Sequence, residues 1–340
     1  MKSKNFAALA TAAGLSLIAA VAVYSARAPW TVSTTGTEKL MPGLQTDAGK
    51  VVRVVVTQGG KTTTIEKSSD QWQVRNQDGY PASADKVRTL LTALADAKLL
   101  EPKTRMTERY ATLEVDDPSG KNSNARLIKL EDADGATVAA VIAGKPRLHG
   151  GTAGAGAAGT YVRMPGEEQS WLASTTISGG AALKDWVNPR VFETQTEKIG
   201  EVTVEVQGEP PYALKRGADG THQLDPIPAG KKVKYVNMVD NIIEAASFLD
   251  FDGVRKQTAS EEGKAGSVTF KTDDGLTITL KVRREKDGTW ATIDATGEGN
   301  AKKTAEDISA RAKGWEFEIM PSKADTMLKK QADLLEDAAS

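Results

Sequence analysis

The chain has 340 residues, and its 44 lysines and arginines nearly balance 45 aspartates and glutamates, giving a net charge of −1. This balance argues against a nucleic-acid partner, which would require a basic excess. Cysteine is absent and histidine occurs only twice, which excludes disulfides, cysteine nucleophiles, thiolate metal sites and histidine clusters.

Residues 1–29 have the arrangement of an exported membrane anchor. Two lysines precede residues 6–24, which carry no charge and consist mainly of alanine and aliphatic residues. A membrane-spanning helix needs roughly 20 apolar residues, and flanking lysines tend to stay in the cytoplasm. We therefore expect a signal anchor, with a single transmembrane helix in the cell inner membrane and the bulk of the chain in the periplasm. The alternative is a signal peptide cleaved after residues 26–28, which Pro29 disfavours.

Residues 30–50 show no periodicity and are expected to form a linker, after which residues 51–192 have the pattern of an α+β unit. Alternating or β-branched runs predict strands, and Tyr80-Pro81 introduces a helix whose apolar residues recur at helical spacing. The predicted strands are 51–57, 62–67, 71–75, 126–131, 137–143, 161–164 and 171–174, and the apolar stripe is Val87, Leu90, Leu91, Leu94 and Leu99.

The same order of elements returns in residues 193–340. Strands are predicted at 202–206, 212–216, 221–224 and 289–294, and a helix is predicted from about Lys231 to Leu249. The apolar positions of this helix are Val236, Val239, Ile243 and Phe248, each 149 residues after a member of the first stripe (236 minus 87, for example). The fold class that we expect is α+β, with two tandem copies of a mainly antiparallel sheet, each with one packed helix. Helices at 305–313 and 323–336 are expected to close the chain.

Gly154, Gly156 and Gly159 match the spacing G-x-G-x-x-G of a dinucleotide-binding loop. Such a loop must open a helix, because the helix N-terminus holds the pyrophosphate. The residues after Gly159, TYVRMP, predict a strand instead, and the acidic residue expected about 20 positions later has no counterpart. We interpret the segment as a hairpin connection and expect no cofactor.

The remaining candidate residues favour structural roles. His149 and His222 lack neighbouring ligands for a metal, and we expect an exposed loop residue and a packed strand residue, respectively. We predict that aspartates beside glycine or proline form turns, that tryptophans pack in cores, and that C-terminal apolar residues dock on their own domain. These residues are Asp116, Asp117, Asp132, Asp134, Asp273 and Asp274; Trp72, Trp171, Trp186, Trp290 and Trp315; and Met327, Leu328, Leu334 and Leu335. No catalytic, metal or cofactor-binding residue is assigned.

Several motifs of the first copy together resemble a known family. The order QWQV, YPASADKVRTLLTALADAKLLEP, RYATLEVDDPSG and YVR is similar to bacterial proteins that carry domain of unknown function 4340. The likeness depends on Trp72, Tyr80-Pro81 and Asp117-Pro118 and is weaker in the second copy, where residues 226–228 replace the Tyr-Pro start of the helix. The resemblance implies a membrane-anchored, outward-facing companion of ABC transporters of the gliding-motility auxiliary type. It implies no catalytic residue.

From the anchor and the resemblance we expect a non-catalytic accessory or binding subunit of an envelope ABC-transport or assembly complex. Its partners would be the inner membrane, through residues 6–24, and an ABC transporter permease or auxiliary subunit. One alternative is a periplasmic ligand- or glycan-binding module that uses a groove between the copies. Another is a hydrolase that depends on carboxylates, which requires two carboxyl groups facing each other across a cleft.

Overall fold

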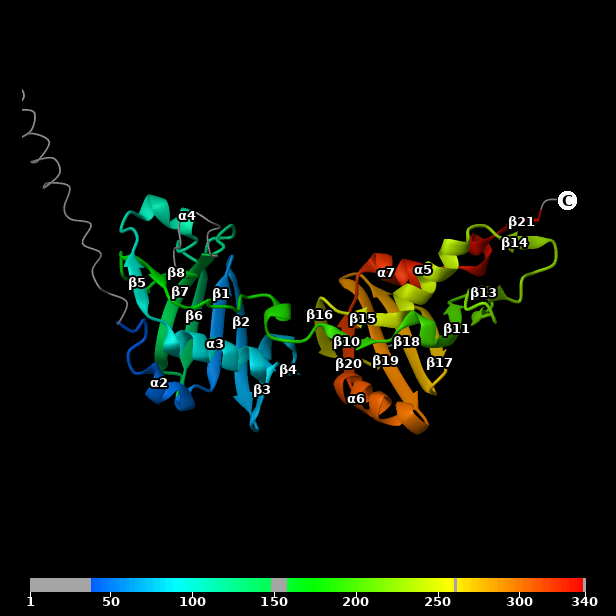
Figure 1. Cartoon of the computed structure of the whole chain (residues 1–340), viewed down its shortest axis with the longest axis horizontal. Coiled ribbons are helices and arrows are strands. Elements are labelled where there is room, and N and C mark those ends of the chain that lie inside the picture. Colours follow the sequence, from blue (N-terminus) through cyan, green and yellow to red (C-terminus); the bar gives the residue numbers. More distant parts are fainter. Residues whose placement is uncertain (1–37, 148–157, 260–261, 339–340) are drawn as a thin grey trace, which may run out of the picture. The chain divides into compact units, whose positions relative to one another are not determined.

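The computed structural model describes residues 38–147, 158–259 and 262–338, which form mostly antiparallel sheets with few helices (Figure 1). The α+β class is therefore confirmed. The predicted transmembrane segment 6–24 lies outside these ranges, as do His149, Gly154 and Gly156. Within these ranges, the structure contains no helix with the length and apolar character needed to cross a membrane.

The chain divides into two compact units. Unit 1 includes residues 89–178, and unit 2 includes residues 61–88 together with the chain from residue 179 onward. The division passes through the first sheet, so the units do not coincide with the predicted copies.

The first sheet has nine strands in the order β4-β3-β2-β1-β6-β7-β8-β9-β5. Helix α3 (Ala84–Asp96) buries Val87, Leu90 and Leu94 as predicted, whereas Leu99 lies in a strand after the helix end. The strands are β1 (Arg53–Gln58), β2 (Lys61–Ser68), β3 (Gln71–Val74), β4 (Tyr80–Pro81), β5 (Leu99–Pro102), β6 (Arg126–Glu131), β7 (Thr137–Arg147), β8 (Gly159–Arg163) and β9 (Ser170–Ala173), with a short helix α4 (Tyr110–Leu113) before β6.

The second sheet has eight strands in the order β13-β12-β11-β17-β18-β19-β20-β16, each antiparallel to its neighbours. Helix α6 (Lys302–Ala312) packs on β19 through buried Ala305, Ile308 and Ala312. The strands are β11 (Ile199–Val206), β12 (Tyr212–Arg216), β13 (His222–Asp225), β16 (Gly253–Lys256), β17 (Lys264–Thr272), β18 (Leu276–Glu285), β19 (Gly288–Gly297) and β20 (Trp315–Glu318).

Two strand pairs flank helix α5 (Val236–Ser247): β10 (Arg190–Glu193) with β15 (Phe248–Asp250), and β14 (Lys231–Val233) with β21 (Leu335–Asp337). The predicted helix 231–249 is therefore too long at both ends, because the backbone there hydrogen-bonds to strand partners. The predicted helix 323–336 is also wrong in extent, since α7 (Pro321–Met327) stops at Met327.

Residues 38–50, which lie in the predicted linker, instead belong to unit 1 and pack within it. Helix α2 (Leu44–Asp47) follows the buried side chains of Leu40 and Met41, and Leu44 is buried as well. The Leu40 N–H donates to the Ala97 carbonyl at 2.8 Å. Buried apolar side chains without helical or strand spacing, together with hydrogen bonds to residues 95–99, hold this segment, and periodicity cannot reveal such contacts. The 3₁₀ turns are η1 (Ala48–Lys50), η2 (Arg75–Gln77), η3 (Thr107–Arg109), η4 (Leu183–Asp185), η5 (Thr196–Lys198), η6 (Gly299–Ala301) and η7 (Gln331–Leu334).

Gly159 begins strand β8 and opens no helix, which confirms the strand predicted after the glycine motif. A Cβ atom at this position would lie 1.9 Å from the carbonyl oxygen of Ala173 on the paired strand β9. The missing side chain therefore allows close approach of two strands, and this approach accounts for the glycine without a nucleotide.

We expect Gly159→Ala to lower the free energy of unfolding by about 1–3 kcal/mol, because the added methyl group forces β8 and β9 apart. Urea unfolding of the full chain measures the change. Gly49→Ala serves as the control, since its Cβ would meet no atom within 4 Å. Equal stability of the two variants would contradict a packing role for Gly159.

Candidate functional site

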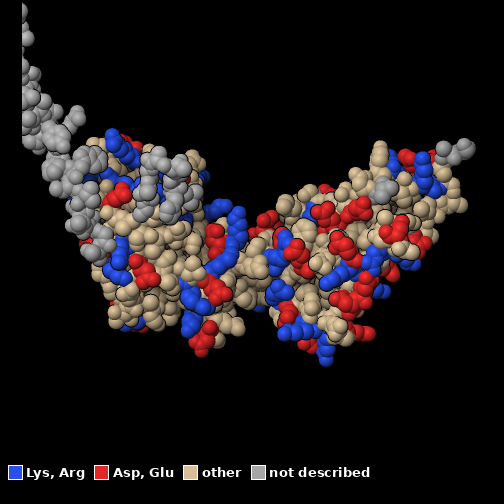
Figure 2. Space-filling model, viewed as in Figure 1, with Lys and Arg blue, Asp and Glu red and all other residues tan. Residues whose placement is uncertain are grey.

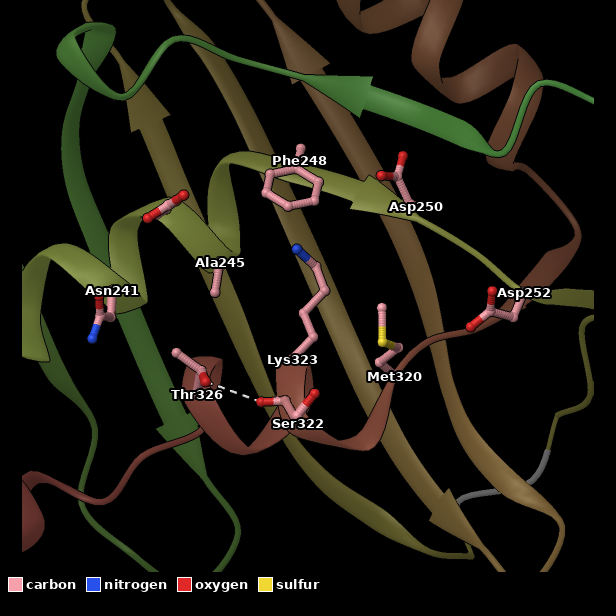
Figure 3. A pocket seen from close by; sticks show the side chains of 10 residues that line it. Asn241, Ala245, Phe248, Asp250, Asp252, Met320, Ser322, Lys323 and Thr326 are labelled. Carbon is pink, nitrogen blue, oxygen red and sulfur yellow. Dashed lines mark hydrogen bonds between the residues drawn. The ribbon is translucent and has the colours of Figure 1, made fainter. Parts of the chain in front are cut away.

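A cavity of about 390 Å³ lies among α5, β15 and α7 in unit 2 (Figure 3). Its wall includes the apolar side chains of Ala245, Phe248 and Met320, and Lys323 enters it from α7. Cavities that bind small molecules have similar volumes, and they combine a mostly apolar lining with a few placed polar groups. This cavity is therefore the candidate functional site.

The local sequence determines where each wall of the cavity lies. Helix α5 ends at Ser247 and passes directly into β15, whose antiparallel pairing with β10 places Arg190 opposite Asp250 and Glu193 opposite Phe248. Pro321 begins α7, where its missing N–H costs no helical hydrogen bond. Lys323 and Thr326, three positions apart, both line the cavity (Figure 3).

Lys323 is a half-buried lysine whose ammonium nitrogen is shielded from solvent and has no hydrogen-bond partner among the described residues. Its Nζ atom lies 3.6 Å from the centre of the Phe248 ring, a cation–π contact. Burial is the main cause that lowers the pKa of Lys323 to about 8. The charge of Arg190 acts in the same direction, whereas Asp250 and Glu244 oppose it.

Asp250 is held by Arg190 and not by Lys323. The Arg190 Nε donates to Oδ1 at 2.6 Å and Nη2 donates to Oδ2 at 2.7 Å, a bidentate pair. Hydrogen bonds from Arg190 keep the pKa of Asp250 below its usual value, although its partial burial opposes them. The guanidinium carbon also lies 4.7 Å from the Phe248 ring centre. The cavity thus presents an amine beside an aromatic ring, and Asp250 is already paired with Arg190.

The structure places the predicted candidate residues away from this cavity. His222 is buried on β13, where Nε2 lies 2.7 Å from the Ile199 carbonyl oxygen, so the predicted packed strand residue is confirmed. Trp186, Trp290 and Trp315 are buried, as expected for core residues, whereas Trp72 and Trp171 are half-buried.

Asp132 and Asp117 have the turn chemistry predicted for them. The Asp132 carboxylate accepts hydrogen bonds from the backbone N–H groups of Asp134 and Ala136, and the Asp117 carboxylate accepts one from Ser119. In the described ranges no group of three or more acidic or histidine side chains could hold a metal ion. Of the C-terminal apolar residues, Met327, Leu328 and Leu334 are buried, and Leu335 pairs with Val233.

The fold and the cavity define an α+β protein of antiparallel sheets that carries a buried lysine in a small-molecule-sized cavity. The chain belongs to the family described as "Domain of unknown function (DUF4340)", whose model matches residues 72–268, more than half of the chain. The matched range contains α5 and β15 but ends before α7, which carries Lys323. No curated protein and no solved structure matches the chain significantly.

Proposed function

We propose that the protein is a non-catalytic binding or accessory subunit of an envelope ABC-transport or assembly complex, anchored in the inner membrane through residues 6–24. The cavity carries this proposal, because an apolar wall with one ammonium that lacks an acceptor is a feature of binding sites. The two lysines and the uncharged run at the N-terminus support export to the periplasm.

The two sheets, we infer, descend from a tandem duplication of one α+β unit. In each strand order a hairpin series (β3-β2-β1 or β13-β12-β11) adjoins four consecutive strands (β6 to β9 or β17 to β20). The edge strand that follows them comes after the helix in sequence, β5 in one sheet and β16 in the other. This shared order supports a repeated scaffold, of which the second copy carries the cavity.

The surface charge supports a partner other than nucleic acid. Basic and acidic side chains are interspersed over the face shown in Figure 2, in keeping with the net charge of −1. A nucleic-acid surface would require a basic stripe.

A reporter fusion tests the compartment. We expect alkaline phosphatase fused after Ser340 to be active, because this enzyme folds only outside the cytoplasm, and we expect removal of residues 1–29 to abolish the activity. A cytosolic reporter at the same position serves as the matched control. If only the cytosolic reporter is active, the periplasmic role is wrong.

The partner is tested by crosslinking in intact cells, mild detergent extraction and mass spectrometry. We expect an ABC permease, ATPase or auxiliary subunit to purify with the full chain. Recovery of the chain without any such subunit would contradict the accessory role, even if the reporter confirms the compartment.

A further inference from the structure

We propose that the cavity among α5, β15 and α7 binds a small apolar molecule that carries one carboxylate, with Lys323 as the group that receives the carboxylate. This inference rests on the proposed binding function and names its ligand class. Three features of the cavity carry it: the ammonium, the apolar wall and the acidic residues beside it.

The ammonium of Lys323 can donate three hydrogen bonds, and no described residue accepts one. Shielding such a group from water without a partner is costly. Asp250, the acid on the adjacent strand, already accepts two hydrogen bonds from Arg190. A ligand carboxylate supplies the missing acceptor once the flexible Lys323 side chain turns its shielded ammonium from the Phe248 ring toward the cavity.

The apolar residues of the cavity wall favour a ligand whose remaining part is apolar. Phe248 and Ala245 line the cavity, and Met320 beside them is 62% exposed. A ring or short chain placed against these residues would remove their apolar surface from water. The cavity volume of about 390 Å³ suits a molecule of this size.

The acidic residues limit the ligand to a single negative charge. Glu244 on α5 and Asp252 after β15 are exposed and line the same cavity. Their charges disfavour phosphates and other multiply charged anions, because like charges in one site repel. One carboxylate adds a single negative charge, which the ammonium of Lys323 neutralises.

Binding is coupled to the proton of Lys323. The charged groups that act on its ammonium are Glu244 from α5, Asp250 from β15 and Arg190 from β10, and burial lowers its pKa to about 8. A bound carboxylate favours the charged amine. The affinity is therefore expected to be full below pH 8 and to fall as the pH rises above it.

The test uses the full chain in lipid nanodiscs and four probes: 3-phenylpropionate, 3-phenylpropionamide, 3-phenylpropylamine and phenyl phosphate. Calorimetry or ligand-observed NMR measures each affinity. We expect 3-phenylpropionate to bind at least tenfold more tightly than the other three, and to bind at least tenfold more weakly at pH 9.5 than at pH 7.

Three variants test whether Lys323 itself binds the carboxylate. Lys323→Met is expected to lose at least tenfold in affinity for the carboxylate, and Lys323→Arg is expected to keep part of it and lose the pH dependence. Lys256→Met serves as the control and should bind as wild type, because Lys256 lies 3.7 Å over the Trp315 ring and outside the cavity. Circular dichroism checks that each variant is folded.

Lack of saturable carboxylate binding at millimolar concentration would overturn the ligand class, as would equal binding to wild type and Lys323→Met. Tighter binding of phenyl phosphate would also overturn it. None of these results bears on the anchor or on the partner subunit, which the reporter and crosslinking experiments test separately.

Discussion

Glu316→Gln is expected to lower the free energy of unfolding by about 3–5 kcal/mol, the usual cost of removing one charge from a buried ion pair. Glu316 lies on β20 and is 1% exposed. One of its carboxylate oxygens is 2.6 Å from Nη2 of Arg283, and the other is 2.9 Å from Nε of Arg255.

The cost follows from what the substitution leaves behind. Burial alone would raise the pKa of Glu316, but the Thr258 N–H and the two arginines donate hydrogen bonds to its carboxylate and hold the pKa below its usual value. Glutamine keeps the shape of the side chain but removes the negative charge. Its amide group also turns N–H donors toward guanidinium groups that themselves only donate.

Asp294→Asn provides the control for this prediction. Asp294 on β19 also forms an ion pair, 2.9 Å from Lys281, but both side chains are more than 60% exposed. Exposed pairs contribute roughly 0–1 kcal/mol. Urea unfolding is the suitable measurement, because guanidinium chloride would screen the charges. Equal losses of unfolding free energy in the two variants would contradict the prediction that burial makes the Glu316 ion pair more stabilising than an exposed one.

Strands with a clean alternation could be predicted from the sequence to within a residue. The bounds of β6, Arg126–Glu131, and of β12, Tyr212–Arg216, agree with the prediction, because each run alternates and ends at a turn. The alternation shows which face of the strand is buried, and it can be read from the residues of the strand itself.

Elements whose bounds depend on pairing with residues far away in the sequence could not be predicted. Apolar residues continue the helical spacing through Phe248, yet Phe248 pairs with Glu193, and Val233 pairs with Leu335 about a hundred residues later. Such contacts override local propensity and leave no mark on nearby spacing.

The candidate site also depends on contacts between residues far apart in the sequence, so the sequence alone does not reveal it. Lys323 is one of many lysines in the sequence, and it becomes distinctive only because α7 packs on α5. Arg190, which neutralises Asp250, is 60 residues away from it. A residue whose environment comes from three separate segments carries no local motif, so composition and spacing favoured a structural interpretation of the C-terminal region.

Raising the pH from 8 to 10.5 is expected to stabilise the wild-type chain relative to Lys323→Met, by at most about 3 kcal/mol. The pKa of Lys323 is lowered from 10.5 to about 8 in the folded chain, mainly by burial. Between these two values the unfolded chain holds a proton at this residue and the folded chain does not. The folded state therefore gains stability as the pH rises across this range, and below pH 8 the cost of the buried charge is fully present.

The measurement is urea unfolding of both proteins at a series of pH values in this range, with the difference in free energy plotted against pH. Other lysines and tyrosines titrate in both proteins and cancel in the difference. Lys256→Met controls for the loss of one ammonium, because it removes an exposed lysine that also lies over an aromatic ring. A constant difference between wild type and Lys323→Met would mean that the amine is hydrated in the folded chain. The cavity would then lack the unpaired donor on which its proposed ligand depends.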